Sequence, residues 1–342
     1  MRDIRRGRSD GMGWVVGALR RTEVGLLLVL IVLCVVFSLF TNRFATGGTL
    51  NQLLINTAII LIPCVGEALV LFTRNIDVSV GSMIGISAVF AASTAANNPG
   101  LPLVVVVFLA CCVGFVLGSI NGLLVALLRV PAIMVTLGTL YVYRGFDSLM
   151  TGSNQLSSTF LPSGYADVPL WSFYGIPGIF LYAAAITLAA YVFVAHTYSG
   201  RSMLALGSNR LAADKLGIPS ALLVYGVFAA TGALCGLAGV LWGGLYGTVD
   251  SSAATGYEIV VLAGVVIGGV SVLGGRGSIG GVFLGAAILA TISVGLALLN
   301  VSQFWVQALQ GLVILGAIAA ELVLRGRAAS WFGWLRRAQG AG

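Results

Sequence analysis

The chain has 342 residues, of which 58% are hydrophobic and 8% are charged, and its mean hydropathy is +1.03. Soluble domains contain about 25% charged residues, so this chain has too little polar surface to cover its apolar residues in water. The formal net charge is +7, but the basic residues lie between apolar runs and form no single cluster. We therefore expect a membrane protein in contact with lipid, and no nucleic acid as a partner.

The apolar residues fall into ten segments, each near the length of about 20 residues that a helix needs to span a bilayer. Backbone N–H and C=O groups in lipid must be paired within the protein, so these segments are expected to be helices. The third and eighth are short and flanked by Gly-rich loops, which are features of broken or re-entrant helices. We predict an all-α polytopic membrane protein with about ten transmembrane helices. The ten segments are residues 24–40, 51–72, 78–96, 102–128, 131–150, 177–197, 220–246, 258–273, 280–299 and 304–324.

The basic residues predict the orientation of these segments. If both termini are cytoplasmic, sixteen of the eighteen Lys and Arg residues lie on the cytoplasmic side, and only Arg43 and Arg144 lie outside. Such a distribution is a strong positive-inside signal. Six arginines precede the first apolar segment and no small-residue cleavage site follows it, so we expect an uncleaved span. The predicted domains are a basic cytoplasmic tail (1–23), a transmembrane domain (24–324) and a cytoplasmic C-terminal tail (325–342).

Two hydrophilic segments interrupt the apolar pattern. Residues 151–177 are rich in Ser, Asn, Gly and Pro and fall outside the cell, whereas residues 197–220 fall in the cytoplasm. Within the second segment, residues 209–216 have the pattern of a short helix. Asn209 is a suitable N-cap, and Gly217 and Pro219 supply a stop signal. We predict a short helix at the cytoplasmic surface.

Several kinds of chemistry are excluded by residue counts and spacing. The only lysine, Lys215, is not part of a P-loop, and the only histidine, His196, cannot form a zinc-binding pair. The five cysteines all lie inside apolar runs, where they act as small apolar residues. The glycines of residues 275–280 spell G-x-G-x-x-G, but no strand precedes them and no acid follows for many residues, so we interpret them as a tight turn. We expect no catalytic residue, no metal site and no cofactor in this chain.

Polar residues within the apolar segments are candidates for function, because such residues are costly in a membrane. Glu67 is the deepest, and two roles stay open for it: a hydrogen bond to a polar ligand such as a sugar hydroxyl, or a bond that fixes helix packing. For Asp77 and Ser79, N-terminal capping of the following helix is favoured over ligand contact.

Four segments resemble, together and in the same order, the motifs of permease subunits from carbohydrate-type ABC importers, the ribose, xylose, rhamnose and autoinducer-2 permease family. They are TRNIDVSVGS, NGLLVALLRVPAIMVTLGTLYVYRG, GSNRLAADKLGI and VIGGVSVLGGRGSIGG. Arg74-Asn75 replaces the commoner Gly-Gly, a variant that resembles the autoinducer-2 permeases. The motif residues in the membrane domain are Asp77, Ser79, Gly81, Ser82, Pro131, Gly138, Gly274, Gly275 and Gly277.

The resemblance implies a transport subunit of the bacterial inner membrane that is not itself an enzyme. It would translocate a monosaccharide or sugar-like signal, such as a pentose, a deoxyhexose or autoinducer-2. The implied partners are cytoplasmic ATPase subunits that hold ATP and Mg²⁺, a second permease copy or paralogue, and an extracytoplasmic substrate-binding protein. The 197–220 loop would couple the chain to the ATPase. Its matching residues are Gly207, Asn209, Ala212, Ala213, Gly217 and Ile218.

For the substrate path, the candidates are Glu67, Asn121, Thr136 and Arg144. Two alternative functions stay open. One is an ABC permease for branched-chain amino acids, against which the IDVSVGS and GGRGS segments argue. The other is a secondary transporter driven by an ion gradient, which would work without an ATPase.

Overall fold

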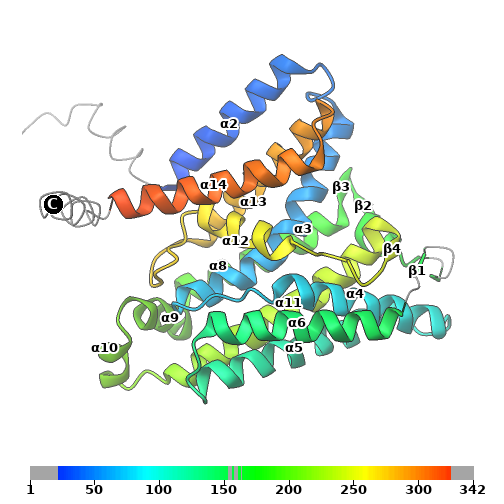
Figure 1. Ribbon diagram of the computed structural model, residues 1–342. Helices are drawn as coiled ribbons and strands as arrows, with labels where there is room; N and C mark the ends of the chain where they lie inside the picture. Colours follow the sequence, from blue (N-terminus) through cyan, green and yellow to red (C-terminus); the bar gives the residue numbers. More distant parts are fainter. Residues whose placement is uncertain (1–21, 153–155, 158–160, 163, 325–342) are drawn as a thin grey trace, which may run out of the picture.

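The computed structural model describes residues 22–152, 156–157, 161–162 and 164–324 (Figure 1). The two predicted tails, residues 1–23 and 325–342, lie outside the described residues apart from Thr22 and Glu23. The described chain is almost wholly helical, which confirms the predicted fold class.

Each of the ten predicted apolar segments coincides with one helix. Seven of these helices, α2, α3, α4, α5, α8, α11 and α13, are long and apolar enough to cross a membrane. By contrast, α12 has 11 residues and a length of about 16 Å, too short for a hydrocarbon layer of about 30 Å. The exact number of spans and the side of each terminus stay predictions. The helices are α2 (Thr22–Phe40), α3 (Gly47–Phe72), α4 (Val80–Asn97), α5 (Leu103–Ala126), α6 (Ala132–Thr151), α8 (Gly178–His196), α11 (Ser220–Tyr246), α12 (Tyr257–Ile267), α13 (Ile279–Leu298) and α14 (Gln303–Leu324).

The remaining elements are short and lie at the two ends of the helices. The predicted cytoplasmic segment forms α9 (Tyr198–Ser208) and α10 (Arg210–Lys215). At the opposite end, α7 (Asp167–Leu170) accompanies two small antiparallel pairs, β1 (Leu156–Ser157) with β4 (Thr248–Val249) and β2 (Ser172–Phe173) with β3 (Ile176–Pro177). Figure 1 shows α9 and α10 at the left and the four strands at the right, so the two hydrophilic segments lie at opposite ends, as predicted.

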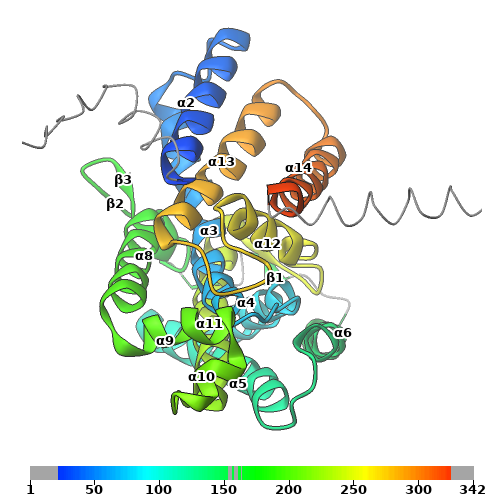
Figure 2. The same cartoon turned by 90° about the vertical axis from the view of Figure 1, so that its left-hand side faces the viewer.

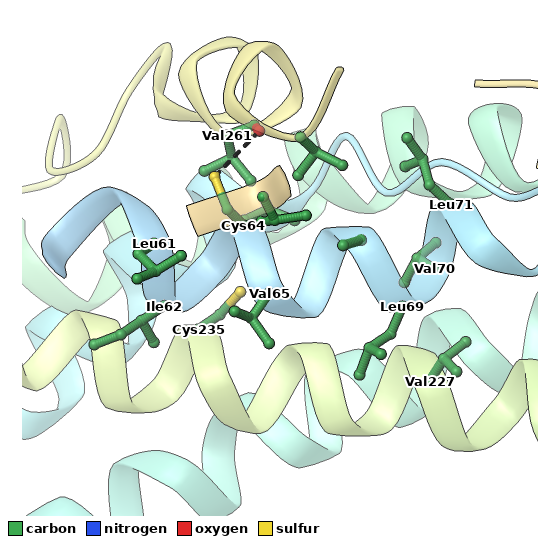
Figure 3. Packing of buried hydrophobic residues seen from close by; sticks show 14 of the residues in the cluster. Leu61, Ile62, Cys64, Val65, Leu69, Val70, Leu71, Val227, Cys235 and Val261 are labelled. Atoms are coloured by element: carbon green, nitrogen blue, oxygen red, sulfur yellow. Dashed lines mark hydrogen bonds between the residues drawn. The ribbon is translucent and has the colours of Figure 1, made fainter. Parts of the chain in front are cut away.

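Helix α3 is the centre of the packing (Figure 2). Every residue from Thr57 to Phe72 is buried, whereas only 6% of the apolar window of α2 is buried. Figure 3 shows Cys64 of α3 pointing to α12, where its thiol donates to the Val261 carbonyl at 3.3 Å, and Leu69 pointing to Val227 of α11. The exposed apolar faces of the outer helices are the surface that lipid is expected to cover.

Glycines bring α5 and α11 into backbone contact. Gly114 and Gly118 of α5 face Gly232 and Gly236 of α11, and a Cβ added at Gly232 would lie 2.8 Å from the Gly118 Cα. These pairs follow the small-xxx-small spacing that lets helices in a membrane approach closely. Neither helix can therefore take a larger residue at these positions without separating from the other.

Replacing Gly232 with Ala is expected to lower the stability of the protein, because the added methyl group overlaps the backbone of α5. Overpacking of this kind costs about 1–3 kcal/mol, which thermal unfolding in detergent would detect as a lower midpoint. Gly226→Ala on the same helix is the control, since a Cβ there meets no atom within 4 Å. Equal midpoints for the two variants would contradict the close contact.

Candidate functional site

Residues 73–79 re-enter the protein between α3 and α4. The Asp77 backbone N–H donates to Glu67 Oε1 at 3.1 Å. Glu67 lies more than one turn before the end of α3, so the segment has turned back along that helix before α4 begins. Asp77 is 3% exposed and Ser79 is fully buried. The third predicted span thus begins beside the inner part of α3 and not at the end of the bundle.

A chain of hydrogen bonds joins this segment to α5 and α6. Asp77 Oδ1 accepts from the Ser79 N–H at 2.9 Å and from the Ser79 hydroxyl at 2.6 Å. Ser79 Oγ in turn accepts from Asn121 Nδ2 at 2.8 Å. The Tyr143 hydroxyl lies 3.2 Å from Asn121 Oδ1. We call Glu67, Asp77, Ser79, Asn121 and Tyr143 the buried polar chain.

These bonds agree only in part with the capping role that we predicted for Asp77 and Ser79. Asp77 accepts the backbone N–H of Ser79, the N-cap residue of α4, whereas the Ser79 side chain makes no cap hydrogen bond. Burial makes the Asp77 bond necessary, because backbone groups must be paired where water is absent. Thr136 has a related position, since its hydroxyl donates to the Ile76 carbonyl at 3.4 Å. For Glu67, the packing role is the one that its observed bond supports.

A second polar group lies in the half of the bundle nearer β1 and β4. Arg144 Nη1 donates to the Ala253 carbonyl at 2.6 Å and lies 3.5 Å from Asp147 Oδ2. Glu258, the second residue of α12, approaches the same face of α4, where its carboxylate packs on Gly81. We call Arg144, Asp147 and Glu258 the outer charge cluster.

Room for the outer charge cluster comes from two glycines of α4. A Cβ at Gly85 would lie 2.6 Å from Arg144 Nη1 and 2.9 Å from Asp147 Oδ2, and a Cβ at Gly81 would overlap Glu258 Oε2. The Asp147 side chain is fully buried. Arg144 was predicted as a site residue, but Asp147 and Glu258 were not. The signal for Asp147 was its i, i+3 spacing from Arg144 within an apolar segment.

The four predicted path residues therefore lie in two places. Glu67, Asn121 and Thr136 surround the re-entrant segment and are at most 1% exposed, whereas Arg144 belongs to the outer charge cluster. None of them is among the residues that line the three cavities found in the described part of the chain.

A polar cavity with a volume of about 550 Å³ lies elsewhere in the described part of the chain. It is lined by the N-terminal parts of α3, α12 and α14 and the C-terminal parts of α11 and α13, at the end opposite α9 and α10. The lining side chains are neutral amides, hydroxyls, aromatic rings and small apolar groups. The polar and aromatic ones are Gln52, Asn56, Trp242, Tyr246, Thr255, Tyr257, Ser293, Gln307 and Gln310. Sequence reasoning did not identify this cavity, because its walls form only when α3 packs against α11 to α14, which lie about 150 residues or more further along the chain.

Glycines also bring three parts of the chain into backbone contact: the end of α3, the last turn of α9 and the turn that precedes α13. The Gly275 N–H donates to the Phe72 carbonyl at 3.2 Å. A Cβ at Gly207, in the last turn of α9, would overlap the Phe72 carbonyl and lie 2.6 Å from the Gly275 nitrogen. Gly274 and Gly275 have φ of +80° and +72°, a conformation that favours glycine. We call Phe72, Gly207, Gly274 and Gly275 the glycine junction.

Local structure at the predicted cytoplasmic helix agrees with the sequence. The Ala212 N–H donates to Asn209 Oδ1 at 3.1 Å, so Asn209 caps α10. Gly217 follows with a φ of +75°, and the Ile218 N–H donates to the buried Ala213. The tight turn predicted for the glycines of residues 275–280 lies slightly earlier, at Gly274–Gly277, because α13 already begins at Ile279; Gly277 has a φ of +144° and packs on Phe72.

The long apolar helices, with polar groups buried among them, are those of a multi-span membrane protein. Residues 49–318 match the family described as branched-chain amino acid transport system / permease component, and the chain belongs to that family.

Curated relatives of this chain are permease proteins of autoinducer 2 import systems. LsrC of Salmonella typhi is 34% identical over 303 residues, which cover 89% of this chain and 86% of the relative. LsrC of Enterobacter sp. (strain 638) is 35% identical over 307 residues, 90% of this chain and 88% of the relative. LsrC of Yersinia pseudotuberculosis is 34% identical over 299 residues, 87% and 84% of the two chains. No solved structure matched.

These matches confirm the resemblance to ABC permeases that the four motifs predicted. With the apolar helices, they identify a multi-pass protein of the inner membrane.

We expect substitutions of Arg144 and of Asp147 in the outer charge cluster to lower the stability of the protein by different amounts. Arg144→Gln leaves Asp147 and Glu258 without their cation and should destabilise the protein by about 3 kcal/mol, the lower end of the range for buried pairs, since the Arg144 side chain keeps 16% exposure. Asp147→Asn should cost less, because Glu258 remains.

The double variant Arg144→Gln/Asp147→Asn should lose less stability than the sum of the two single variants. Thermal unfolding of all three in detergent measures the difference. Strictly additive losses would show that Arg144 and Asp147 do not act as a pair.

Proposed function

We propose that this chain is the membrane-spanning permease subunit of a bacterial ABC importer for a sugar-like compound. The observation that carries the proposal is about 34% identity, across 89% of the chain, to an autoinducer 2 import permease. The four motifs of the sequence support it independently. Autoinducer-2 is the first candidate cargo, and pentoses and deoxyhexoses such as rhamnose follow.

Such a subunit is not an enzyme, and the energy for transport comes from its partners. We propose two cytoplasmic ATPase subunits that bind ATP and Mg²⁺, a second permease copy or paralogue, and an extracytoplasmic protein that delivers the cargo. The cargo would cross between two permeases by alternating access. Glu67, Asn121, Thr136 and Arg144 would then meet it only in another state of that cycle, because they are buried or half-buried in this one.

Segment 197–220 is proposed as the docking element for the ATPase. The exposed part of this segment is α10. The buried part is α9, whose last turn contributes Gly207 to the glycine junction. Force applied to a short rigid helix is passed to whatever packs rigidly against it. Here that is the end of α3, where the re-entrant segment starts, and the glycine turn that precedes α13. The proposed coupling residues, some exposed and some buried, are Gly207, Asn209, Ala212, Ala213, Gly217 and Ile218.

A branched-chain amino acid permease is the second candidate, since the family description names that substrate class. An amino acid carries two charges, and buried charges need partners. The described side chains that line the cavity include no charged group. This chemistry favours a neutral cargo.

Uptake of labelled compounds tests the proposal. Deletion of the chain from its natural host should abolish uptake of one compound from a panel of autoinducer-2, D-ribose, D-xylose, L-rhamnose and L-leucine, and return of the chain should restore it. Unchanged uptake across the sugars and autoinducer-2 would contradict the proposed function, and loss of leucine uptake alone would favour the second candidate.

A substitution in the glycine junction tests the coupling role. Gly207→Val should force α9 away from Phe72, because even a Cβ overlaps that carbonyl. The expected result is a complex that still assembles with its ATPase but transports about tenfold less cargo per ATP hydrolysed, equivalent to a loss of about 1.4 kcal/mol of coupling free energy. Gly226→Val is the control, since that position is open. Equal transport by both variants would exclude the junction from coupling.

A further inference from the structure

The cavity between α3, α11, α12, α13 and α14 has no assigned role, and it contains none of the residues that the motifs single out. We propose that it is a binding site for a small, neutral, polyhydroxylated compound at the extracytoplasmic end of the permease. The inference rests on the proposed function, and it adds the location and chemistry of the site where cargo enters the chain.

Size and position support the assignment. The volume of about 550 Å³ lies within the range of roughly 300–1,000 Å³ that is typical of small-molecule sites. The cavity is at the end opposite α9 and α10, which is the extracytoplasmic end if the positive-inside orientation holds. A compound released by a binding protein would reach this cavity before it reached the buried polar chain.

The polar groups of the cavity are suited to hydroxyl groups. An amide both donates and accepts hydrogen bonds, as a hydroxyl does. Gln52 and Gln307 face the cavity from α3 and α14 with exposed side chains. Among the described residues, neither amide has a hydrogen-bond partner, so both are available to a ligand. Gln310 Nε2, at 3.4 Å from Ser293 Oγ, adds a third amide on the same wall.

Aromatic rings form another side of the cavity. Trp242 packs on Tyr246 with ring centroids 4.5 Å apart and on Tyr257 at 5.0 Å, edge to face. This contact holds the three rings as a rigid wall. Flat rings offer an apolar face to the C–H side of a sugar ring while their polar atoms reach a wet edge. Amides from α3 and α14, together with rings from α11 and α12, therefore match a compound that has both hydroxyls and C–H faces.

Charge excludes other classes of ligand. Among the described lining residues there is no Asp, Glu, Lys, Arg or His. An ionic ligand buried there would lose its hydration with no counter-charge in return. A lipid chain or other apolar compound would leave the amides of Gln52 and Gln307 without partners. A neutral compound with several hydroxyls avoids both costs.

The experiment uses the complete importer, reconstituted in proteoliposomes with its ATPase and binding protein. The probes are labelled autoinducer-2, D-ribose, D-xylose, L-rhamnose and L-leucine, and the best probe of the wild type is used for the variants. The test variant is Gln52→Leu/Gln307→Leu. Its matched control is Asn51→Leu, which removes an exposed amide one residue away that does not line the cavity.

We expect the double variant to assemble normally and to hydrolyse ATP at the basal rate of the wild type. Its transport at low probe concentration should fall about tenfold, because each lost hydrogen bond contributes about 0.5–1.5 kcal/mol. The control should transport within about twofold of the wild type. If the double variant assembles poorly, Gln52→Leu alone replaces it, with an expected loss of about threefold.

Two results would overturn the inference, and they can be told apart. Transport by the double variant within twofold of the Asn51→Leu control, in an importer that carries a sugar or autoinducer-2, rejects this cavity while leaving the proposed function intact. A wild-type importer that carries only L-leucine, or none of the probes, rejects the proposed function and this site together.

Discussion

Residues 73–79 leave the helical hydrogen-bond pattern, and Asp77 and Ser79 are buried where the segment passes beside Glu67. Every backbone N–H and C=O exposed by such a break must find a partner inside the protein. Glu67 accepts the Asp77 N–H, Asp77 accepts the Ser79 N–H, and Thr136 donates to the Ile76 carbonyl. The position of α4 depends on these bonds, because they determine where that helix begins. The positions of Gly81 and Gly85, and of the charges that pack on them, follow from the same bonds.

Packing on α4 then constrains the outer half of the bundle. Because Gly81 and Gly85 have no side chains, Glu258 and Arg144 can approach the α4 backbone from two other helices. The Arg144 cation close to Asp147 reduces the cost of burying that carboxylate. The outer charge cluster thereby fixes α6 and α12 against α4, while the glycine contact of α5 with α11 fixes the other side of the domain.

Local features were predictable from the sequence, and long-range ones were not. The apolar segments, the Asn209 cap and the turn at Gly274–Gly277 depend on residues close in the chain, so pattern alone located them. The bond from Asn121 to Ser79 joins residues 42 positions apart, and no periodicity encodes such a contact. Glu258 was missed because it stands at the edge of an apolar segment, where a single acid is usually a solvated end group. The cavity needs five helices in place before Gln52 and Gln307 can both line it.

Helix α12 connects the neutral cavity, the outer charge cluster and the glycine junction. Its first residue, Tyr257, lines the neutral cavity, and its second, Glu258, lies in the outer charge cluster. Its last turn leads into the glycine turn whose Gly275 bonds to Phe72 and packs on α9. A helix that spanned the bilayer would be held by both interfaces, but α12, at about 16 Å, is held only by protein. Because protein interiors are close-packed, a displacement of α12 changes the cavity wall and the glycine junction together. The eighth apolar segment of the sequence already indicated that this helix is short. Because a short helix is held only by protein, α12 connects the cavity at one end of the domain with the glycine junction at the other.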